Sequence, residues 1–156
     1  MKIIHLMSQK YLTGAEVYAT GIAEKQIANG NEVTLVSDTI NVPTNIEFVA
    51  MPISKHRYII RLLNAFKLAR YCKKNNIDVI HAHSRAACWV AYLTKKLNNN
   101  IAYVVTLHDM QKPHRMARRW NIYGENMIAV SEVIKDSFVN NLHIPEEQIN
   151  VIRNGL

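Results

Sequence analysis

The sequence contains few of the residues that mark special protein classes. Its 156 residues include only two cysteines, five glycines and four prolines, which excludes a disulfide scaffold and a collagen-like chain. No stretch approaches the roughly 20 apolar residues of a membrane-spanning helix, and the short apolar run at residues 3–7 lacks the features of a signal peptide. We therefore expect a cytoplasmic protein with free thiols at Cys72 and Cys88. Any contact with a membrane would be peripheral, on its inner face.

The residues that are abundant indicate one folded domain with an excess of positive charge. Hydrophobic residues make up 49% and charged residues 20%, close to the averages of globular proteins, which argues against disorder. Nineteen Lys and Arg against twelve Asp and Glu give a net charge of +7. This surplus favours an anionic partner.

Short apolar segments alternate with helical patterns along the whole chain. Strands are predicted at 2–7, 32–37, 46–50, 77–82, 101–107, 126–130 and 149–152, and helices at 14–28, 58–74, 85–97 and 131–141. This order predicts an α/β fold with a doubly wound, mostly parallel sheet and helices on both faces. Residues 108–125 have no clear period and are predicted to be a loop, either functional or disordered.

Polar residues follow several predicted strands, at the edge of a parallel sheet where ligands bind. The segment after the first strand leads to Gly14 at a predicted helix start, where backbone N–H groups and the helix dipole favour a phosphate. The sequence lacks both the G-x-G-x-x-G of a dinucleotide site and the G-K-[ST] of a P-loop. A phosphate-binding loop and a glycine with only a conformational role both remain open.

Two histidines, His83 and His108, stand at the ends of neighbouring predicted strands. A pair of histidines at neighbouring strand ends is more typical of a functional site than of ordinary hydrogen-bonded residues. His81, His83, His108 and Asp109 are types that bind metals, but no third and fourth ligand follow at a recognisable spacing. No metal site is predicted.

The cations fall into two groups that a doubly wound sheet would bring to one rim. Arg57 and Arg61 precede and begin one helix, and the other group lies in the loop at 108–125, with Arg115, Arg118 and Arg119. Apolar residues lie among both groups, as in surfaces that meet anionic headgroups. A membrane, a phosphorylated acceptor and an ordinary solvated face are the alternatives. Nucleic acid is not predicted, because no fold signature for it is present.

Five short segments form a recognisable series. They are T-G-A-E at 13–16 with the helix and strand that follow, I-D-V-I-H-A-H-S at 77–84, V-V-T-L-H-D at 104–109, I-A-V-S-E at 128–132 and V-I-R-N-G at 151–155. In this order, across nearly the whole chain, they resemble the N-terminal half of family-four glycosyltransferases, which are retaining enzymes of the two-domain GT-B architecture.

The resemblance implies that residues 1–156 form a single Rossmann-like, acceptor-side N-terminal domain. The donor-binding C-terminal domain would be absent, so the isolated chain would be inactive. The full-length protein would be a retaining hexosyl transferase of cell-envelope polysaccharide biosynthesis. Its partners would be a nucleotide-sugar donor, which is a substrate, and a glycan or lipid-linked acceptor. No cofactor and no metal are implied.

The resemblance also implies roles for individual residues. His83 would be the catalytic residue near the transferred sugar, and Thr13 and Gly14 would form the donor-phosphate loop. Thr13 stands where the family often has a second glycine, and its Cβ restricts φ. From their places after the first and fifth predicted strands, and not from the resemblance, Glu16, His108 and Asp109 are expected to contact the acceptor. The charge pattern, independently of any family, assigns Arg57, Arg61, Arg115, Arg118 and Arg119 to an anionic acceptor or membrane.

The alternative is a basic α/β module without catalysis that binds an anionic ligand or a nucleotide. The coding sequence downstream of Leu156 distinguishes the two. A second α/β domain there favours the transferase, and an immediate stop favours the module.

Overall fold

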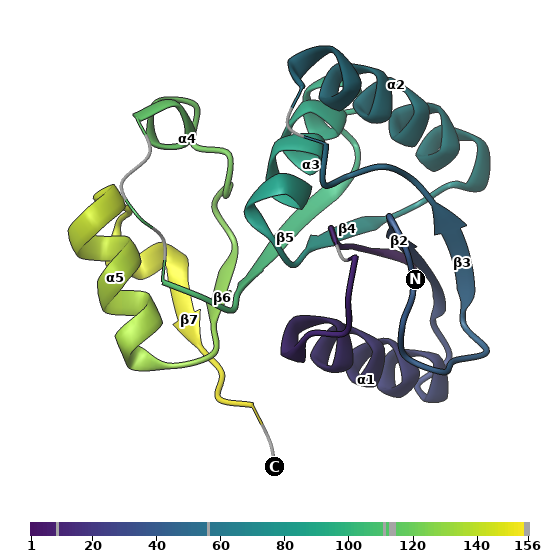
Figure 1. Ribbon diagram of the computed structural model, residues 1–156, viewed down its shortest axis with the longest axis horizontal. Coiled ribbons are helices and arrows are strands. Elements are labelled where there is room, and N and C mark those ends of the chain that lie inside the picture. The colour runs from purple at the N-terminus through teal and green to yellow at the C-terminus, as the bar shows by residue number, and fades with distance from the viewer. Residues whose placement is uncertain (9, 56, 111, 113–114, 155–156) are drawn as a thin grey trace.

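The computed structural model describes residues 1–8, 10–55, 57–110, 112 and 115–154, without the side chains of Arg115 and Arg118. Within these residues, one sheet carries helices on both faces (Figure 1). The strands are β1 Lys2–Leu6, β2 Glu32–Ser37, β3 Glu47–Ala50, β4 Val79–Ala82, β5 Ala102–Leu107, β6 Met127–Ala129 and β7 Ile149–Val151. The helices are α1 Gly14–Ala28, α2 Tyr58–Asn75, α3 Arg85–Leu97, α4 Arg115–Arg119, α5 Glu132–Leu142 and the 3-10 turn η1 Glu146–Gln148.

The sheet has seven strands in the order β3-β2-β1-β4-β5-β6-β7, and every neighbouring pair is parallel. The chain runs outward from β1 to β3 and then returns to place β4 beside β1. The strand order therefore reverses between β1 and β4, where doubly wound sheets bind ligands outside the carboxyl ends of the strands. The Rossmann-like, doubly wound parallel sheet predicted from the sequence is confirmed.

Side-chain caps start three helices directly after strands or their loops. Thr13, Ser84 and Ser131 are the N-caps of α1, α3 and α5, and each hydroxyl accepts from a backbone N–H three residues on, at 3.3, 3.2 and 3.3 Å. Such caps satisfy one of the donors left free at a helix start. They fix the polar N-terminal turns of these helices at the carboxyl edge of the sheet.

Helices cover the two faces unequally (Figure 1). α1 packs on one face through Ala19 and Ala23, against Ile3, Val33 and Leu35. A larger buried cluster on the other side of the sheet joins β-strand residues to α2, α3 and α5. None of the described helices has the length and apolar character needed to cross a membrane.

Part of the segment 108–125 is helical. The prediction of a loop throughout is wrong for Arg115–Arg119, which form α4. A helix this short gives no detectable period. The segment ends against the core, where the buried Tyr103 hydroxyl donates to the carbonyl of Ile122 at 2.7 Å.

Candidate functional site

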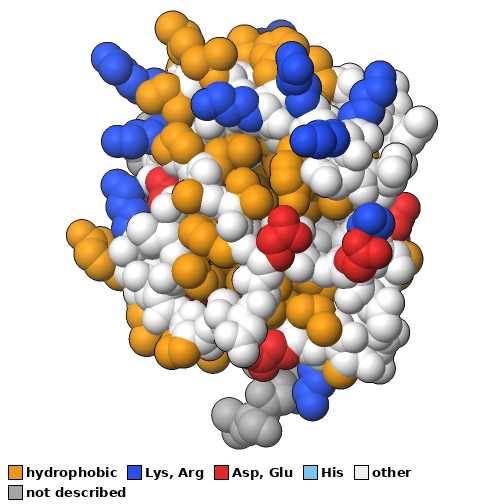
Figure 2. Space-filling view, turned by 90° about the vertical axis from the view of Figure 1, so that its right-hand side faces the viewer, with side chains coloured by type: hydrophobic (Ala, Val, Ile, Leu, Met, Phe, Trp, Pro, Cys, Tyr) orange, Lys and Arg blue, Asp and Glu red, His pale blue; other side chains and the backbone are white. Residues whose placement is uncertain are grey.

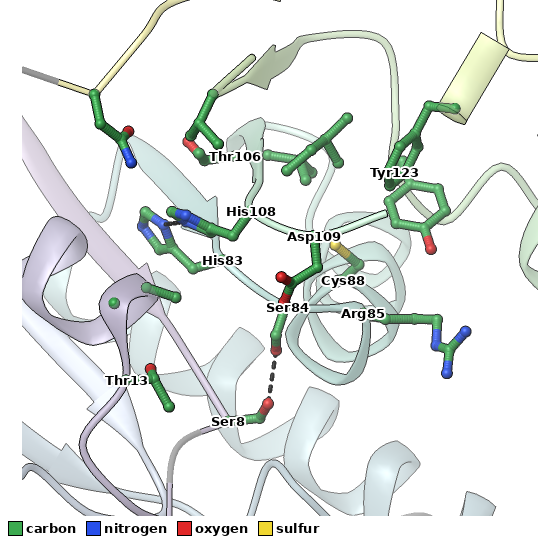
Figure 3. A pocket seen from close by; sticks show the side chains of 17 residues that line it. Ser8, Thr13, His83, Ser84, Arg85, Cys88, Thr106, His108, Asp109 and Tyr123 are labelled. Carbon is green, nitrogen blue, oxygen red and sulfur yellow. Dashed lines mark hydrogen bonds between the residues drawn. The ribbon is translucent and has the colours of Figure 1, made fainter. Parts of the chain in front are cut away.

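A cavity of about 530 Å³ opens at the carboxyl edge of the sheet (Figure 3). Most of its lining comes from the end of β5, the loops after β1, β4 and β5, and the first turns of α1 and α3, and single residues come from α5 and from the segments after β6 and β7. This is the edge at which the strand order reverses between β1 and β4. The volume is that of a small-molecule site. Residues predicted from the sequence that line it are Thr13, Gly14, His83, His108 and Asp109.

The start of α1 presents backbone donors to this cavity. The first intrahelical bonds run from the N–H groups of Glu16 and Val17 to the carbonyl of Thr13, at 3.1 Å each, so the N–H groups of Gly14 and Ala15 precede them. Both residues line the cavity. A Cβ added at Gly14 would meet no described atom within 4 Å, so this glycine borders open space. Such a helix start suits an anionic group.

Thr13 has a defined structural task. Its backbone is extended, with φ −137° and ψ 160°, which any residue adopts. Its hydroxyl caps α1 by accepting from the N–H of Glu16. Threonine in place of a second glycine therefore adds a helix cap without backbone strain.

Two serines join the first loop to α3. The hydroxyls of Ser8 and Ser84 lie 2.7 Å apart and are hydrogen-bonded, as the dashed line in Figure 3 marks. Ser84 is also the cap of α3. One side of the cavity is thus fixed to the other at the switch between β1 and β4.

His83 lies deep in the site and is only 2% exposed. Its Nε2 is 2.8 Å from Nδ1 of His5, and its Nδ1 is 3.2 Å from Nε2 of His108 (Figure 3 shows His83 beside His108). Its backbone N–H donates to the carbonyl of Leu6 at 3.0 Å. The side chain is therefore held from both ring nitrogens and from the backbone.

Burial keeps the histidines of the site neutral. Loss of solvent, reinforced by His81, His5 and His108, holds the pKa of His83 well below its usual value. Burial likewise lowers the pKa of His81 to about 3 and that of His108 to about 4, and the neighbouring Asp109 opposes the shift at His108. At neutral pH each ring therefore offers one hydrogen-bond donor and one acceptor.

His5, His81 and His83 also resemble a metal centre, since their ligand atoms lie within 4.8 Å of one another. Both nitrogens of His5 and both of His83 are already hydrogen-bonded, and Nε2 of His81 lies 2.7 Å from the Thr106 hydroxyl. A metal would have to replace most of these bonds. The arrangement fits a hydrogen-bonded cluster better than a metal centre.

Glu16 lies outside the cavity lining, although the sequence assigned it to the acceptor. It is fully buried, at 0% exposure. Its Oε1 accepts from the backbone N–H of Asn41 at 2.6 Å, and the Asn41 amide donates to both carboxylate oxygens at 3.4 and 3.3 Å. This carboxylate holds the loop after β2 against α1.

The segments that carry the two cation groups contact each other through apolar and aromatic side chains. The Tyr58 hydroxyl lies 3.4 Å from the sulfur of Met116, which joins the start of α2 to α4. The guanidinium of Arg61 lies 5.7 Å from the ring of Trp89, which in turn is 6.2 Å from Trp120. Arg57 directly precedes Tyr58 in the chain, and Arg119 directly precedes Trp120. The side chains of Arg115 and Arg118 lie outside the described residues.

Sequence reasoning assigned no role to three residues of the site, His5, Gln26 and Arg85. Arg85 lines the cavity at the first position of α3 and adds a positive charge there. His5 touches His83, and Gln26 touches His5, with Oε1 2.7 Å from Nε2. The one signal for His5 was a histidine within the short apolar run at residues 3–7.

The model of one protein family matches nearly the whole chain. The model of Glycosyltransferase Family 4 matches residues 12–156. A search of curated proteins finds no match.

Three solved structures show the same fold. A glycosyltransferase from Rickettsia africae superposes with a TM-score of 0.85 and 24% identity, over 99% of this chain and 43% of that one. Anabaena Alr3699/HepE, in complex with UDP and glucose, superposes with a TM-score of 0.78 and 19% identity, over 100% of this chain and 45% of that one. The lipopolysaccharide outer core galactosyltransferase WaaB superposes with a TM-score of 0.74 and 13% identity, over 100% of this chain and 46% of that one. The chain therefore spans less than half the length of each.

Proposed function

We propose that this chain, which belongs to glycosyltransferase family 4, forms the acceptor-binding, N-terminal half of a retaining sugar transferase of the GT-B type. A second domain, outside this sequence, would bind most of the nucleotide-sugar. The observation that carries the proposal is the cavity at the switch between β1 and β4. Neutral histidines and a helix start line it together, which suits a sugar joined to a phosphate.

The donor would lie between the two halves, with its diphosphate near the start of α1. No described residue accepts a hydrogen bond from the N–H groups of Gly14 and Ala15, which can face its oxygens. Arg85 adds a positive charge to the same lining. Transfer on one face of the sugar depends on positioning and on stabilising the leaving phosphate. Most of that stabilisation would come from the second domain, so residues 1–156 by themselves should not transfer sugar.

His83 would contact the transferred sugar, and His108 and Asp109 would contact the acceptor. Both histidines line the cavity as neutral rings. Asp109 is exposed at the mouth of the cavity, where an incoming hydroxyl could donate to its carboxylate. Glu16 has no part in this proposal, since its carboxylate is bound to Asn41.

The acceptor would be lipid-linked and reached at an anionic membrane surface. Figure 2 shows Lys and Arg side chains over the upper part of the molecule, around α2, with hydrophobic side chains between them. One stripe of α2 exposes Tyr58, Ile59, Leu62, Leu63 and Phe66, and α4 and its end add Met116 and Trp120. We call these seven residues the α2–α4 surface. Arg57, Arg61 and Arg119 lie beside it, with Arg115 and Arg118 assigned to it from sequence.

Gly14→Ala tests the donor-phosphate role. The new methyl group would enter open space at the cavity, so the fold should be kept. It would occupy space where the donor diphosphate is proposed to lie, so donor affinity should fall by about tenfold, or about 1.4 kcal/mol. Isothermal titration of a UDP-sugar or GDP-sugar into the complete gene product measures it. The matched control is Gly21→Ala, on the same helix and also in open space, which should leave affinity unchanged. Equal affinity in both variants would remove Gly14 from the donor site.

The α2–α4 surface should bind anionic vesicles. We expect the chain to sediment with phosphatidylglycerol vesicles and not with phosphatidylcholine vesicles, and to be released by salt. Each cation near the surface contributes about 1 kcal/mol, so Arg119→Glu should weaken binding about tenfold or more. Ile59→Asp, at a side chain that is 74% exposed, should weaken it without harming the fold. Lys25→Glu, exposed on α1, is the matched control.

Equal sedimentation with both vesicle types would contradict a membrane role. So would anionic binding that Arg119→Glu leaves intact. Either result would leave a soluble acceptor or an ordinary solvated face.

A further inference from the structure

A line of hydrogen-bonded side chains runs from the surface of α1 to the cavity. Gln26 Oε1 lies 2.7 Å from Nε2 of His5, and Nδ1 of His5 lies 2.8 Å from Nε2 of His83. Nδ1 of His83 then lies 3.2 Å from Nε2 of His108. The line joins α1, β1 and the loops after β4 and β5, and it ends at the residues predicted to meet the sugar.

The Gln26–His5 bond determines which ring nitrogen donates and which accepts in each of the other bonds. A neutral imidazole has one N–H donor and one acceptor nitrogen, so a bond at one nitrogen sets the role of the other. Burial lowers the pKa of His5 and of His83, which keeps both rings neutral. Gln26 Oε1 is a carbonyl oxygen and only accepts. His5 must then carry its proton on Nε2 and accept on Nδ1.

We propose that Gln26, acting through His5, holds His83 as the Nε2–H tautomer, so that Nδ1 of His83 is a hydrogen-bond acceptor toward the cavity. In the free chain His108 Nε2–H donates to this nitrogen. The proposal rests on the proposed function in one respect, which is that a sugar hydroxyl takes the place of His108 when the donor binds. Gln26 and His5 are positioning residues, because neither lines the cavity.

The tautomer can be read directly by NMR of the chain labelled with 15N-histidine at pH 7.5, since protonated and unprotonated ring nitrogens have well-separated 15N shifts. We expect Nε2–H on His5 and on His83. A proton on Nδ1 of His83, or a charged ring, would overturn the proposal.

Two variants test whether Gln26 sets the direction. Gln26→Lys places a donor beside Nε2 of His5, so both rings should switch to Nδ1–H. Gln26→Met removes donor and acceptor and should give a mixture. Ala28→Lys and Ala28→Met, exposed on the same helix, are the matched controls and should keep Nε2–H. If His83 keeps Nε2–H in both Gln26 variants, while circular dichroism shows the native fold, Gln26 does not control the tautomer.

Activity of the complete gene product gives an independent readout. Gln26→Lys should lower kcat/KM for the sugar donor by about tenfold, the effect of losing one hydrogen bond, and Ala28→Lys should not. If the tautomer switches and kcat/KM stays the same, the role of Nδ1 toward the sugar is wrong. If the wild-type protein uses no nucleotide-sugar, the proposed function fails, whereas the NMR result still decides the tautomer.

Discussion

Replacing His83 by Ala in the complete gene product should lower sugar-transfer turnover by about ten- to thousandfold, the range for a positioned polar or acid–base group. His83 lines the cavity and is held from both ring nitrogens and its backbone N–H. Removing the ring takes away the nitrogen that faces the cavity and leaves His5 and His108 without their shared partner. Steady-state kinetics with saturating donor and acceptor measure the effect.

Two isosteric variants separate chemistry from packing at this buried residue. An Asn side chain places an oxygen near the position of Nδ1, and a Gln side chain can place a donor near that of Nε2. His83→Asn should therefore keep more activity than His83→Gln, provided both melt near the wild-type temperature. Wild-type kinetics in His83→Ala would show that the residue has only a structural role.

Acidification should unfold the chain steeply. His5, His81, His83 and His108 all have lowered pKa values in the folded state, with His81 at about 3 and His108 at about 4. In the unfolded chain each has a pKa of about 6.5, so below that pH the unfolded state binds more protons. Stability is complete above about pH 6.5 and is lost as the pH falls toward the folded-state values.

The expected loss of stability on acidification is large compared with the free energy of unfolding of an ordinary domain. Four such groups reduce the free energy of unfolding by up to about 5 kcal/mol per pH unit, against a total of about 5–15 kcal/mol. Urea denaturation at pH 7.5, 6.5 and 5.5 measures the slope.

A histidine variant tests the source of this slope. His108→Gln should reduce the slope by about a quarter, because it removes one of the four buried groups. Stability that is constant from pH 7.5 to pH 5.5 would contradict the presence of buried neutral histidines.

Local sequence patterns predicted most elements of the fold. The helix at 85–97 and the strand at 32–37 have the predicted bounds. Both begin or end at residues with strong local preferences, such as the Ser84 cap. The short helix α4 was missed because five residues give too little periodicity to detect.

The candidate site was predicted in part. Gly14, His83, His108 and Asp109 were recognised because they follow strands, and all four line the cavity. Glu16 was assigned to the acceptor from its place beside the first loop. Its partner Asn41 lies 25 residues away in the chain, and no local pattern records such a contact.

The sequence by itself determined the α/β class, the alternation of strands and helices, and which residues stand at strand ends, because these depend on local periodicity and capping. Only the tertiary structure decided the strand order and the residues behind the site. The strands have similar apolar sequences, so no local pattern predicts that β4 pairs with β1. That pairing sets His5 opposite His81 and brings His5 to His83, 78 residues apart in the chain. The neutral state of these histidines follows from their burial together, which arises only when the strands pair and α1 packs over them.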